Sequence, residues 1–331
     1  MSEFSHKNVL SVKKGLLVKI LLIAASVAAL CIIVGCSSDF AAPFDMANLV
    51  FTYSHVSDSD GEYMIITGHT VSQTDVKIPD TIYGIPVREV GESAFFGEEN
   101  LSSVTFGKNV TKIGANAFGG CTSLETINWN VSMSDIGDYA FQSCHSLDSL
   151  IIPENVTSIG RGAFYDCLWI KQLEVPETVS SIGGRAFSGT TWLENYHATD
   201  EFVTLGDGIL IAYHGNQSHV TLPKNVKKMA GTFAGNIGVE KVTLPSHLEC
   251  IGDMAFMGCT QLKDITVPDS VTEIGADAFC GCTSLQTLHL GSQITSVGDR
   301  AFEHCSAALY VKEGSAVEEY CKKNGIGYTT A

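Results

Sequence analysis

The fold of this chain is decided by a motif that is clearest at residues 151–167, IIPENVTSIGRGAFYDC. Variants of the motif recur along most of the chain, and each carries a phenylalanine that usually follows a small residue. A fixed repeat of this length predicts a solenoid. Neighbouring phenylalanines are 23 residues apart within each of two groups, which are Phe95, Phe118, Phe141, Phe164 and Phe187, then Phe233, Phe256, Phe279 and Phe302.

Each repeat opens with a short alternation of apolar and polar residues, such as Leu173-Glu174-Val175, and a proline follows it. The alternation predicts a half-buried strand. Proline ends that strand because it has no N–H to continue a ladder. Residues 271–275 are typical of the next stretch, which predicts a second short strand broken by glycine. The residues around the phenylalanine, such as Ala278-Phe279, predict one tight helical or 3₁₀ turn.

A single repeat of this kind cannot bury its own apolar side chains, so stacked repeats must share a core. At a strand spacing of about 4.8 Å, we expect the marker phenylalanines to form one internal column. A parallel column of cysteines is expected three residues after the marker. Thiols in register at that spacing are too far apart for the usual disulfide, so we favour buried free thiols over bridges. The column consists of Cys121, Cys144, Cys167, Cys259, Cys282 and Cys305.

The repeat resembles the BspA-like leucine-rich repeat family of bacterial surface proteins, whose turns read roughly LxxIxIPxxVTxIGxxAFxxC. The resemblance covers residues 63–330. It implies a leucine-rich-repeat right-handed superhelix of mostly short parallel β-strands and one-turn helices. The family binds varied partners, so the resemblance implies a binding role without naming a ligand.

The first 35 residues are predicted to be a lipoprotein signal peptide. Lysines precede an uncharged run over residues 20–34, and the run is followed by Gly35-Cys36. This ending resembles a bacterial lipobox, which implies acylation of Cys36 and attachment to the membrane through an N-terminal lipid. The alternative is an uncleaved anchor, because residues 16–35 are about the 20 that a membrane span requires. Both interpretations place the remainder outside the cytoplasmic membrane.

The remaining organisation follows from where the repeat begins, skips and ends. We expect a tether over 36–48, a β-hairpin cap over 49–75 and a solenoid over 76–308. A hairpin insertion is expected at about 190–219, where two apolar runs flank Gly206-Asp207-Gly208. Residues 309–331 are expected to form a cap with a short helix. Its signals are Ser315 as N-cap with Glu318 three residues later, and Gly325 as the stop.

Charge and motifs exclude several classes of function. The formal net charge is −16, and loss of the lysine-rich leader would make the exported part more acidic. An acidic surface disfavours nucleic-acid binding, which relies on clustered Lys and Arg. No metal is expected, because the carboxylates around Asp58 and Asp60 lack the spacing of a calcium loop. No cofactor is expected either.

Catalytic motifs are absent from the sequence. One cluster of histidines lies around the inserted hairpin, near Glu194 and Asp207, and would be the site of a hydrolase if the chain were an enzyme. Loop histidines of this kind are more often plain surface, so we predict that the chain is not an enzyme. The cluster consists of His197, His214 and His219.

The predicted binding face is a row of outward side chains, one from the middle of each predicted first strand. Such a row on an extended sheet is the usual binding face of a solenoid. It consists of Lys77, Thr105, Asn128, Ile151, Glu174, Thr221, Thr243, Thr266 and His289. Trp169, Trp192 and Tyr196 lie near the insertion and are candidates to stack on a sugar or peptide. The alternative for the tryptophans is packing over the hairpin.

Three functions remain open at this point. The leading hypothesis is a lipid-anchored cell-surface protein that binds a protein or glycan of a host or neighbouring cell through its repeat sheet. The second is a structural envelope scaffold without a soluble ligand. The third is a hydrolase at the inserted hairpin.

Overall fold

The computed structural model describes residues 50–70, 72–196 and 200–330. Ala47–Ala331 form one compact unit, and all of the described residues belong to it. The predicted signal peptide, the tether and the lipidated Cys36 lie outside the described residues.

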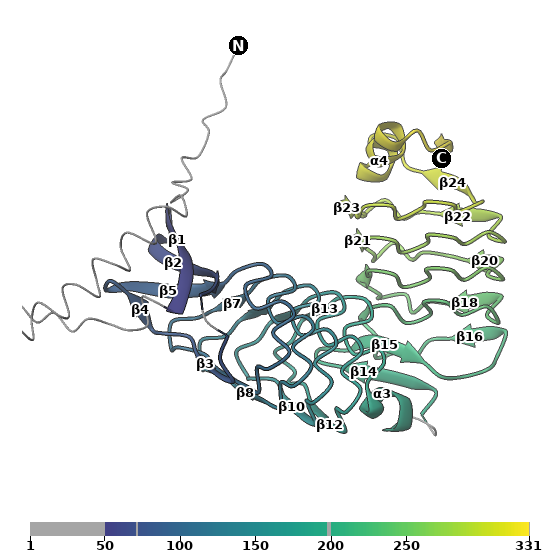
Figure 1. Cartoon of the computed structure of the whole chain (residues 1–331). Coiled ribbons are helices and arrows are strands. Elements are labelled where there is room, and N and C mark those ends of the chain that lie inside the picture. Colours follow the sequence, from purple (N-terminus) through teal and green to yellow (C-terminus); the bar gives the residue numbers. More distant parts are fainter. Residues whose placement is uncertain (1–49, 71, 197–199, 331) are drawn as a thin grey trace, which may run out of the picture. The chain divides into compact units, whose positions relative to one another are not determined.

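Each turn of the chain passes through two short strands on different sides of the solenoid. In the deciding motif these are β10 (Ser149–Ile151) and β11 (Ser158–Ile159). β10 pairs in parallel with β12 (Gln172–Glu174), and β11 pairs in parallel with β13 (Ser181–Ile182). Both pairings join residues one 23-residue repeat apart, such as Leu150 with Leu173. The predicted solenoid of short parallel strands is therefore confirmed, and Figure 1 shows its stacked turns.

The residues around each marker phenylalanine form hydrogen-bonded turns in place of the predicted one-turn helix. The Phe118 N–H donates to the Ala140 carbonyl at 2.8 Å, and the Asn116 N–H donates to the Asp138 carbonyl at 2.9 Å. These bonds lead to the next repeat, whereas the N–H groups between them bond within their own turn, as the Gly119 N–H does to the Asn116 carbonyl at 3.0 Å. Asn116 also has a left-handed backbone, with φ of 55°, which interrupts a right-handed helix.

The first stack of turns begins with an antiparallel hairpin, β1 (Phe51–Asp58) and β2 (Gly61–His69). β2 pairs in parallel with β5 (Ile85–Val90), so the hairpin covers the open end of the first repeat. One sheet then continues from β5 as far as β13. The other strands of this stack are β3 (Asp75–Lys77), β4 (Thr81–Ile82), β6 (Ser103–Thr105), β7 (Lys112–Ile113), β8 (Thr126–Asn128) and β9 (Asp135–Ile136).

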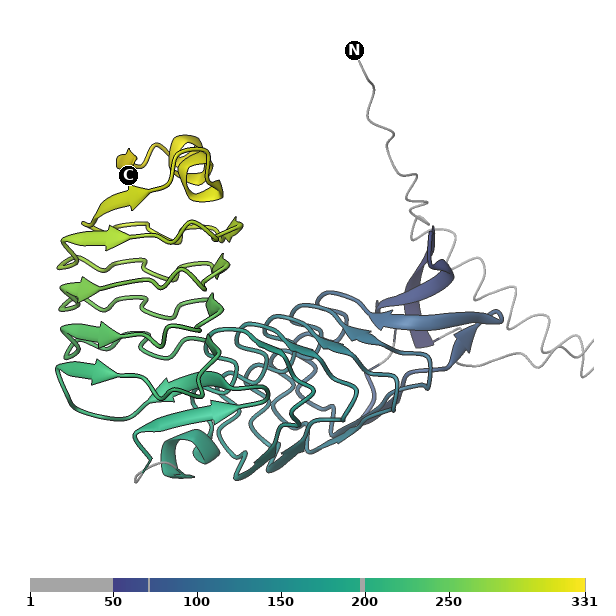
Figure 2. The same cartoon turned by 180° about the vertical axis from the view of Figure 1, so that it is seen from behind.

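A second hairpin begins a second stack in the same way. Its strands are β14 (Phe202–Leu205) and β15 (Ile209–Tyr213), and helix α3 (Thr191–Tyr196) lies beside it in Figures 1 and 2. β15 pairs antiparallel with β14 and parallel with β17 (Lys228–Met229). The further strands are β16 (His219–Thr221), β18 (Lys241–Thr243), β19 (Cys250–Ile251), β20 (Asp264–Ile265), β21 (Glu273–Ile274), β22 (Thr287–His289) and β23 (Ser296–Val297).

The side chains of the second hairpin divide between two hydrophobic cores. Val203, Ile209 and Ala212 pack into the core of the first stack. Leu210 and Tyr213 pack into the core of the second stack. The hairpin therefore closes one core and opens the next.

The marker phenylalanines form two columns, so the prediction of one continuous column is wrong. Phe95 to Phe187 stack with ring centroids 5.0 to 5.7 Å apart. Phe233 to Phe302 form a separate stack with centroids 5.3 to 5.9 Å apart. Between the columns, Tyr213 of the hairpin takes the place of a marker and lies 5.1 Å from Phe233. The column is broken because the hairpin, with its own side chains, stands where the next turn would be.

The predicted cysteine column consists of free thiols. Cys121, Cys144, Cys167, Cys259 and Cys282 are buried, and Cys305 is half-buried. Each buried thiol donates to the carbonyl of the marker phenylalanine one turn earlier, at 3.0 to 3.3 Å. Burial raises the pKa of Cys121 and of Cys259 to about 12, so these thiols stay protonated and unreactive at neutral pH.

The last turn is covered by β24 (Ala308–Val311), helix α4 (Ala316–Asn324) and β25 (Tyr328–Thr330). Ser315 is the N-cap and accepts the Glu318 N–H, and Gly325 ends the helix with φ of 66°, as predicted. The Glu318 carboxylate accepts the Gly314 N–H at 2.8 Å and lies 2.8 Å from Lys322 Nζ. Lys322 and the Gly314 N–H lower the pKa of Glu318 to about 2.

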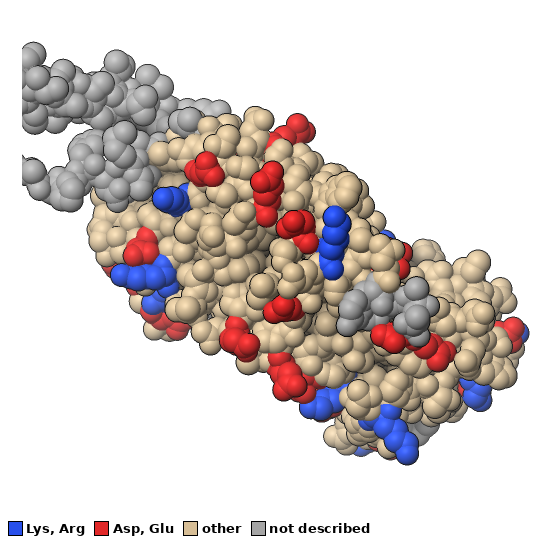
Figure 3. Space-filling view, turned by 90° about the horizontal axis from the view of Figure 1, so that it is seen from below, with Lys and Arg blue, Asp and Glu red and all other residues tan. Residues whose placement is uncertain are grey.

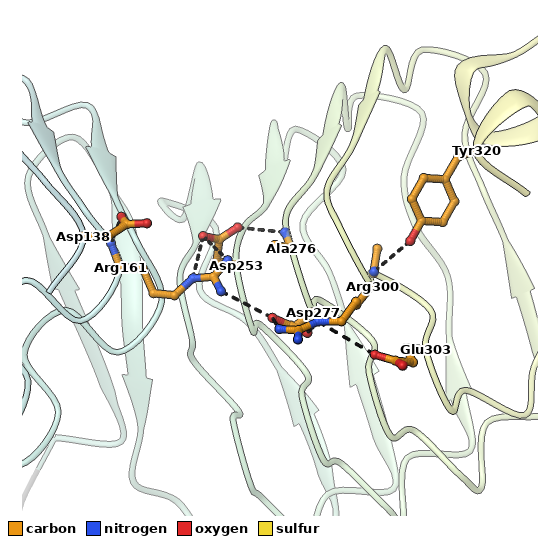
Figure 4. A network of polar contacts seen from close by, with 9 residues as sticks. Asp138, Arg161, Asp253, Ala276, Asp277, Arg300, Glu303 and Tyr320 are labelled. Atoms are coloured by element: carbon orange, nitrogen blue, oxygen red, sulfur yellow. Dashed lines mark hydrogen bonds and ion pairs between the residues drawn. The ribbon is translucent and has the colours of Figure 1, made fainter. Parts of the chain in front are cut away.

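A chain of charged side chains connects the two stacks (Figure 4). Arg161, from the first stack, lies 3.0 Å from Asp253 and 3.4 Å from Asp277 of the second. Asp277 is buried, and its Oδ2 also forms an ion pair with Arg300 Nη2 at 2.8 Å. Arg161 and Asp277 are largely shielded from water, which strengthens their attraction and makes the loss of one partner costly. This network fixes the second stack to the first.

We predict that Phe164→Ala lowers the free energy of unfolding by about 3–5 kcal/mol, the usual cost of deleting a buried aromatic ring. Phe164 is fully buried between Phe141 and Phe187. Chemical denaturation followed by circular dichroism measures the change. Phe96→Ala is the matched control, because the Phe96 side chain is 56% exposed, and we expect it to cost below about 1 kcal/mol. Equal costs for the two variants would contradict the stacked-ring core.

Candidate functional site

The predicted binding row lies on the outer face of the first strands, as expected from the alternation of side chains along a strand. In β18, Val242 is buried whereas Lys241 and Thr243 are exposed. Except at Thr266, which follows the two-residue β20 (Asp264–Ile265), the row residue is the last residue of a three-residue strand and not the middle one, because the strands begin earlier than the alternation suggested. Thr221 pairs with Thr243, and Thr266 forms a bridge to His289.

The row is interrupted between Glu174 and Thr221, because β12 and β16 belong to different sheets. On the first stack, Asn128 Nδ2 donates to Thr105 Oγ1 at 3.1 Å, and Glu174 lies opposite the 53% exposed Ile151. Thr221, Thr243, Thr266 and His289 follow on the second stack. The structure therefore brings the predicted row together as two separate groups.

Two residues of the second group line a hollow of about 350 Å³. Thr221 and Thr243 line it together with Lys224 and His247. The side chains are hydrogen-bond donors and acceptors with one fixed positive charge, so the hollow suits a polar or anionic group. Further along the row, His289 stacks on Tyr310 with ring centroids 4.6 Å apart.

The three aromatic candidates differ in position. The Trp169 side chain is 57% exposed, and Lys171 Nζ lies 5.1 Å from its ring. Trp192 is buried in the first core, so the packing interpretation applies to it. Tyr196 ends α3, and its side chain lies outside what the structure describes.

Trp169 stands at the boundary of two hollows. One, of about 560 Å³, is lined with Glu125, Asp148 and Ser146. The other, of about 320 Å³, is lined with Glu194 and Asn195. A flat exposed ring flanked by carboxylate and amide groups can stack on an apolar sugar or peptide face while the polar groups accept its hydroxyl or amide protons.

Charge on the surface is spread and mostly negative. In Figure 3, acidic side chains are scattered over the visible face and basic side chains do not gather into a patch. Within the described residues, neither helix has the length and apolar character that a membrane crossing requires.

Comparison with known proteins decides the family. Six copies of the model for the BspA type leucine-rich repeat region match residues 69–194 and 205–321. The chain belongs to this family. The two matched ranges leave out the start of the second hairpin, at β14, which is where both the sheet and the phenylalanine column are interrupted.

Several solved structures are similar to this BspA type repeat chain. A leucine-rich repeat protein of T. pallidum is 25% identical, with 71% of this chain and 88% of that chain covered and a TM-score of 0.41. One from Eubacterium ventriosum is 23% identical, with coverages of 80% and 83% and a TM-score of 0.43. A cell surface protein of Faecalibacterium prausnitzii is 24% identical, with coverages of 84% and 97% and a TM-score of 0.35. A search of curated proteins finds no match.

The histidine cluster of the hydrolase hypothesis is not assembled as a site among the described residues of this repeat protein. His197 lies outside those residues, and His214 and His219 are exposed. The Asp207 carboxylate is engaged by Lys227 Nζ. In the part of the chain that the structure describes, no three His, Cys, Asp or Glu side chains are placed to hold a metal ion.

Sequence reasoning missed Lys224 and His247 of the hollow, and Tyr310 at the end of the row. Tyr310 was detectable, because it is the middle residue of the alternating Leu309-Tyr310-Val311, the pattern that marks the first strand of each repeat. Lys224 and His247 lie beyond the strands, in loops whose side-chain directions the repeat pattern does not indicate.

We predict that Trp169→Ser changes the free energy of unfolding by less than about 0.5 kcal/mol, as is usual for surface substitutions. Ser123 and Ser146 occupy the same place in the two preceding turns, so serine is compatible with the backbone. Trp192→Ser is the matched comparison and should cost several kcal/mol, because Trp192 is 8% exposed. Thermal and urea unfolding of both variants check this. A large loss for Trp169→Ser would make that ring structural and not available to a ligand.

Proposed function

We propose that this BspA type leucine-rich repeat protein is displayed outside the cytoplasmic membrane on an N-terminal lipid at Cys36, and that it binds a protein or glycan of a host or neighbouring cell. The observation that carries the binding role is the row of exposed side chains on the first strands. The row repeats at fixed spacing on a rigid stack, so its side chains are ordered before a partner arrives, which lowers the entropic cost of binding.

The hollow at Thr221 and Thr243 is the preferred contact within the row. Lys224 and His247 add donors and a positive charge there, on a chain whose net charge is −16. A basic hollow on an acidic protein selects for an anionic or hydroxyl-rich group, because other parts of the surface repel negative charge. Acidic glycans and carboxylate-rich protein segments fit this description.

The membrane attachment is supported by the N-terminal sequence. Lysines are followed by an uncharged run and then by Gly35-Cys36, the arrangement expected of an exported and acylated chain. A single lipid chain anchors weakly, so stable display requires more than one acyl group. The described residues begin at Val50, so only a short segment of sequence separates Cys36 from the first hairpin.

We predict that Cys36→Ser abolishes incorporation of an alkyne-labelled fatty acid into the chain and releases it from the membrane fraction. The reason is that the thiol of Cys36 is the proposed acceptor of the lipid. Labelling of bacterial cells that produce the full chain, followed by gel fluorescence, measures this. Cys280→Ser is the control, because Cys280 lies in the solenoid and is half-buried. Unchanged labelling of the Cys36 variant would refute the lipoprotein assignment.

We predict that replacing Thr221, Thr243 and Thr266 together with glutamate weakens binding at least about tenfold, because three negative charges are introduced beside a hollow that favours anions. The full chain in mild detergent is screened on arrays of glycans and extracellular-matrix proteins, and the variant is tested on every positive. The matched control replaces Thr157, Thr272 and Thr295 with glutamate. These threonines are exposed beside the second strands. If the control variant lost binding to the array ligands as strongly as the row variant does, the binding site would not be the row.

A further inference from the structure

The row of first strands has an open edge at β12. β12 pairs with β10 on one side, and among the described residues no strand pairs with its other side. The next first strand, β16, belongs to a different sheet. On the other side of the solenoid β15 lies against β13 without pairing with it among the described strands, so the hairpin covers only one of the two sheets at this point.

The open edge presents backbone groups that every preceding turn uses. In the turn before, the Asp148 carbonyl accepts the Lys171 N–H at 2.9 Å, and the Ile152 N–H donates to the Glu174 carbonyl at 3.0 Å. The equivalents one repeat later are the Lys171 carbonyl and the Val175 N–H. Between them, the Leu173 N–H and carbonyl also point away from β10, because a parallel ladder uses alternate residues on each side.

Loss of the neighbouring strand is visible in the burial of the core side chains. Leu173 is 8% exposed, whereas its counterpart Leu150 in β10 is 1% exposed. On the second-strand side, Ile182 of β13 is 6% exposed against 1% for Ile159. The end of the first stack is therefore covered less completely than its interior.

A groove of about 770 Å³ runs along this edge. Its floor and one wall come from β10, β12 and the Val175-Pro176 step, and its opposite wall comes from β14. Phe202 and Thr204 of β14 and Trp192 of α3 line it. β14 is itself the last strand of its sheet, so the groove lies between two strands that each lack a neighbour.

The charges of the groove favour a basic occupant. Three carboxylates line it, from Glu154, Glu174 and Asp200, against the single cation of Lys171. Lys171 lies with its Nζ over the Trp169 ring. Glu154 has no ion pair among the described residues, and Glu174 accepts a hydrogen bond from Gln172 at 3.0 Å.

We propose that the groove takes an extended segment of a partner protein, which adds as a strand to β12 and places Lys or Arg side chains against Glu154 and Glu174. Main-chain hydrogen bonds to Lys171, Leu173 and Val175 supply affinity, and the carboxylates select basic residues at alternate positions. A second copy of this chain is a poor occupant, because its charge is equally negative. The inference rests on the proposed binding function, but the groove shares only Ile151 and Glu174 with the row and no residue with the hollow at Thr221 and Thr243.

The test uses a fluorescein-labelled heptapeptide of alternating lysine and valine and the full chain in mild detergent. Fluorescence anisotropy should show saturable binding. The same peptide methylated on every internal backbone nitrogen should bind at least about tenfold more weakly, because it keeps the charge but cannot pair as a strand. Peptides of alternating glutamate and valine should not bind. Equal affinity of the methylated and unmethylated peptides would overturn strand addition.

Protein variants locate the binding. Glu154→Gln with Glu174→Gln should weaken the lysine peptide at least about fivefold, whereas Glu99→Gln with Glu313→Gln, which removes the same charge at exposed sites elsewhere, should not. Hydrogen exchange followed by mass spectrometry should show protection of residues 171–175 when the peptide is bound. Protection confined to other residues, or absence of binding by the lysine peptide, would refute the proposal.

The row and the groove are distinguished by crossing the two sets of variants. The triple glutamate variant of the threonine row should keep its affinity for the lysine peptide, and the single Glu154→Gln variant, which changes no residue of the row, should keep its array positives. If the lysine peptide binds and no array ligand does, the proposed role of the row is refuted and that of the groove is kept. If array ligands bind to the row and the lysine peptide does not bind, the proposed role of the groove alone is refuted.

Discussion

The structure depends on one constraint, which is that no turn can bury its own phenylalanine. Phe164 is buried because Phe141 and Phe187 lie on its two faces, and the same holds along both columns. The strands obey the same rule, since each uses alternate backbone groups toward the turn before and the turn after. Stability is therefore shared between neighbours, and every end of a stack needs a cover.

The second hairpin is best understood as such a cover placed inside the chain. It repeats the arrangement of β1 and β2, in which an antiparallel hairpin offers its second strand to the first turn of a stack. It also covers the preceding core, because Val203 and Ile209 face that side. The remaining join is polar, with Arg161 reaching Asp253 and Asp277, and Lys228 Nζ donating to the Ser180 carbonyl at 2.7 Å.

The period of the sequence was enough to predict the solenoid, the register of its strands and the buried thiols, because these follow from which residues recur every 23 positions. It did not predict the break in the phenylalanine column, since a skipped marker between Phe187 and Phe233 does not show whether strands pair across the gap. Nor did it predict the left-handed backbone that recurs at equivalent positions of the turns, because the residues there, such as Asn116, Tyr139 and Arg185, share no local preference. The exposure of Trp169 and burial of Trp192 depend on how α3 packs.

A regular solenoid offers a partner only side chains, because the backbone groups of interior strands are all used by neighbouring turns. An interruption changes this where its cover reaches only one of the two sheets. In this chain β15 lies against β13 at the end of the sheet of second strands, whereas β12 has no strand beyond it among the described residues. Open edges are normally blunted, and Pro176 and the charged Lys171 and Glu174 limit uncontrolled pairing at this one. The same carboxylate, together with Glu154, makes the edge selective, since it repels another acidic chain and attracts a basic strand.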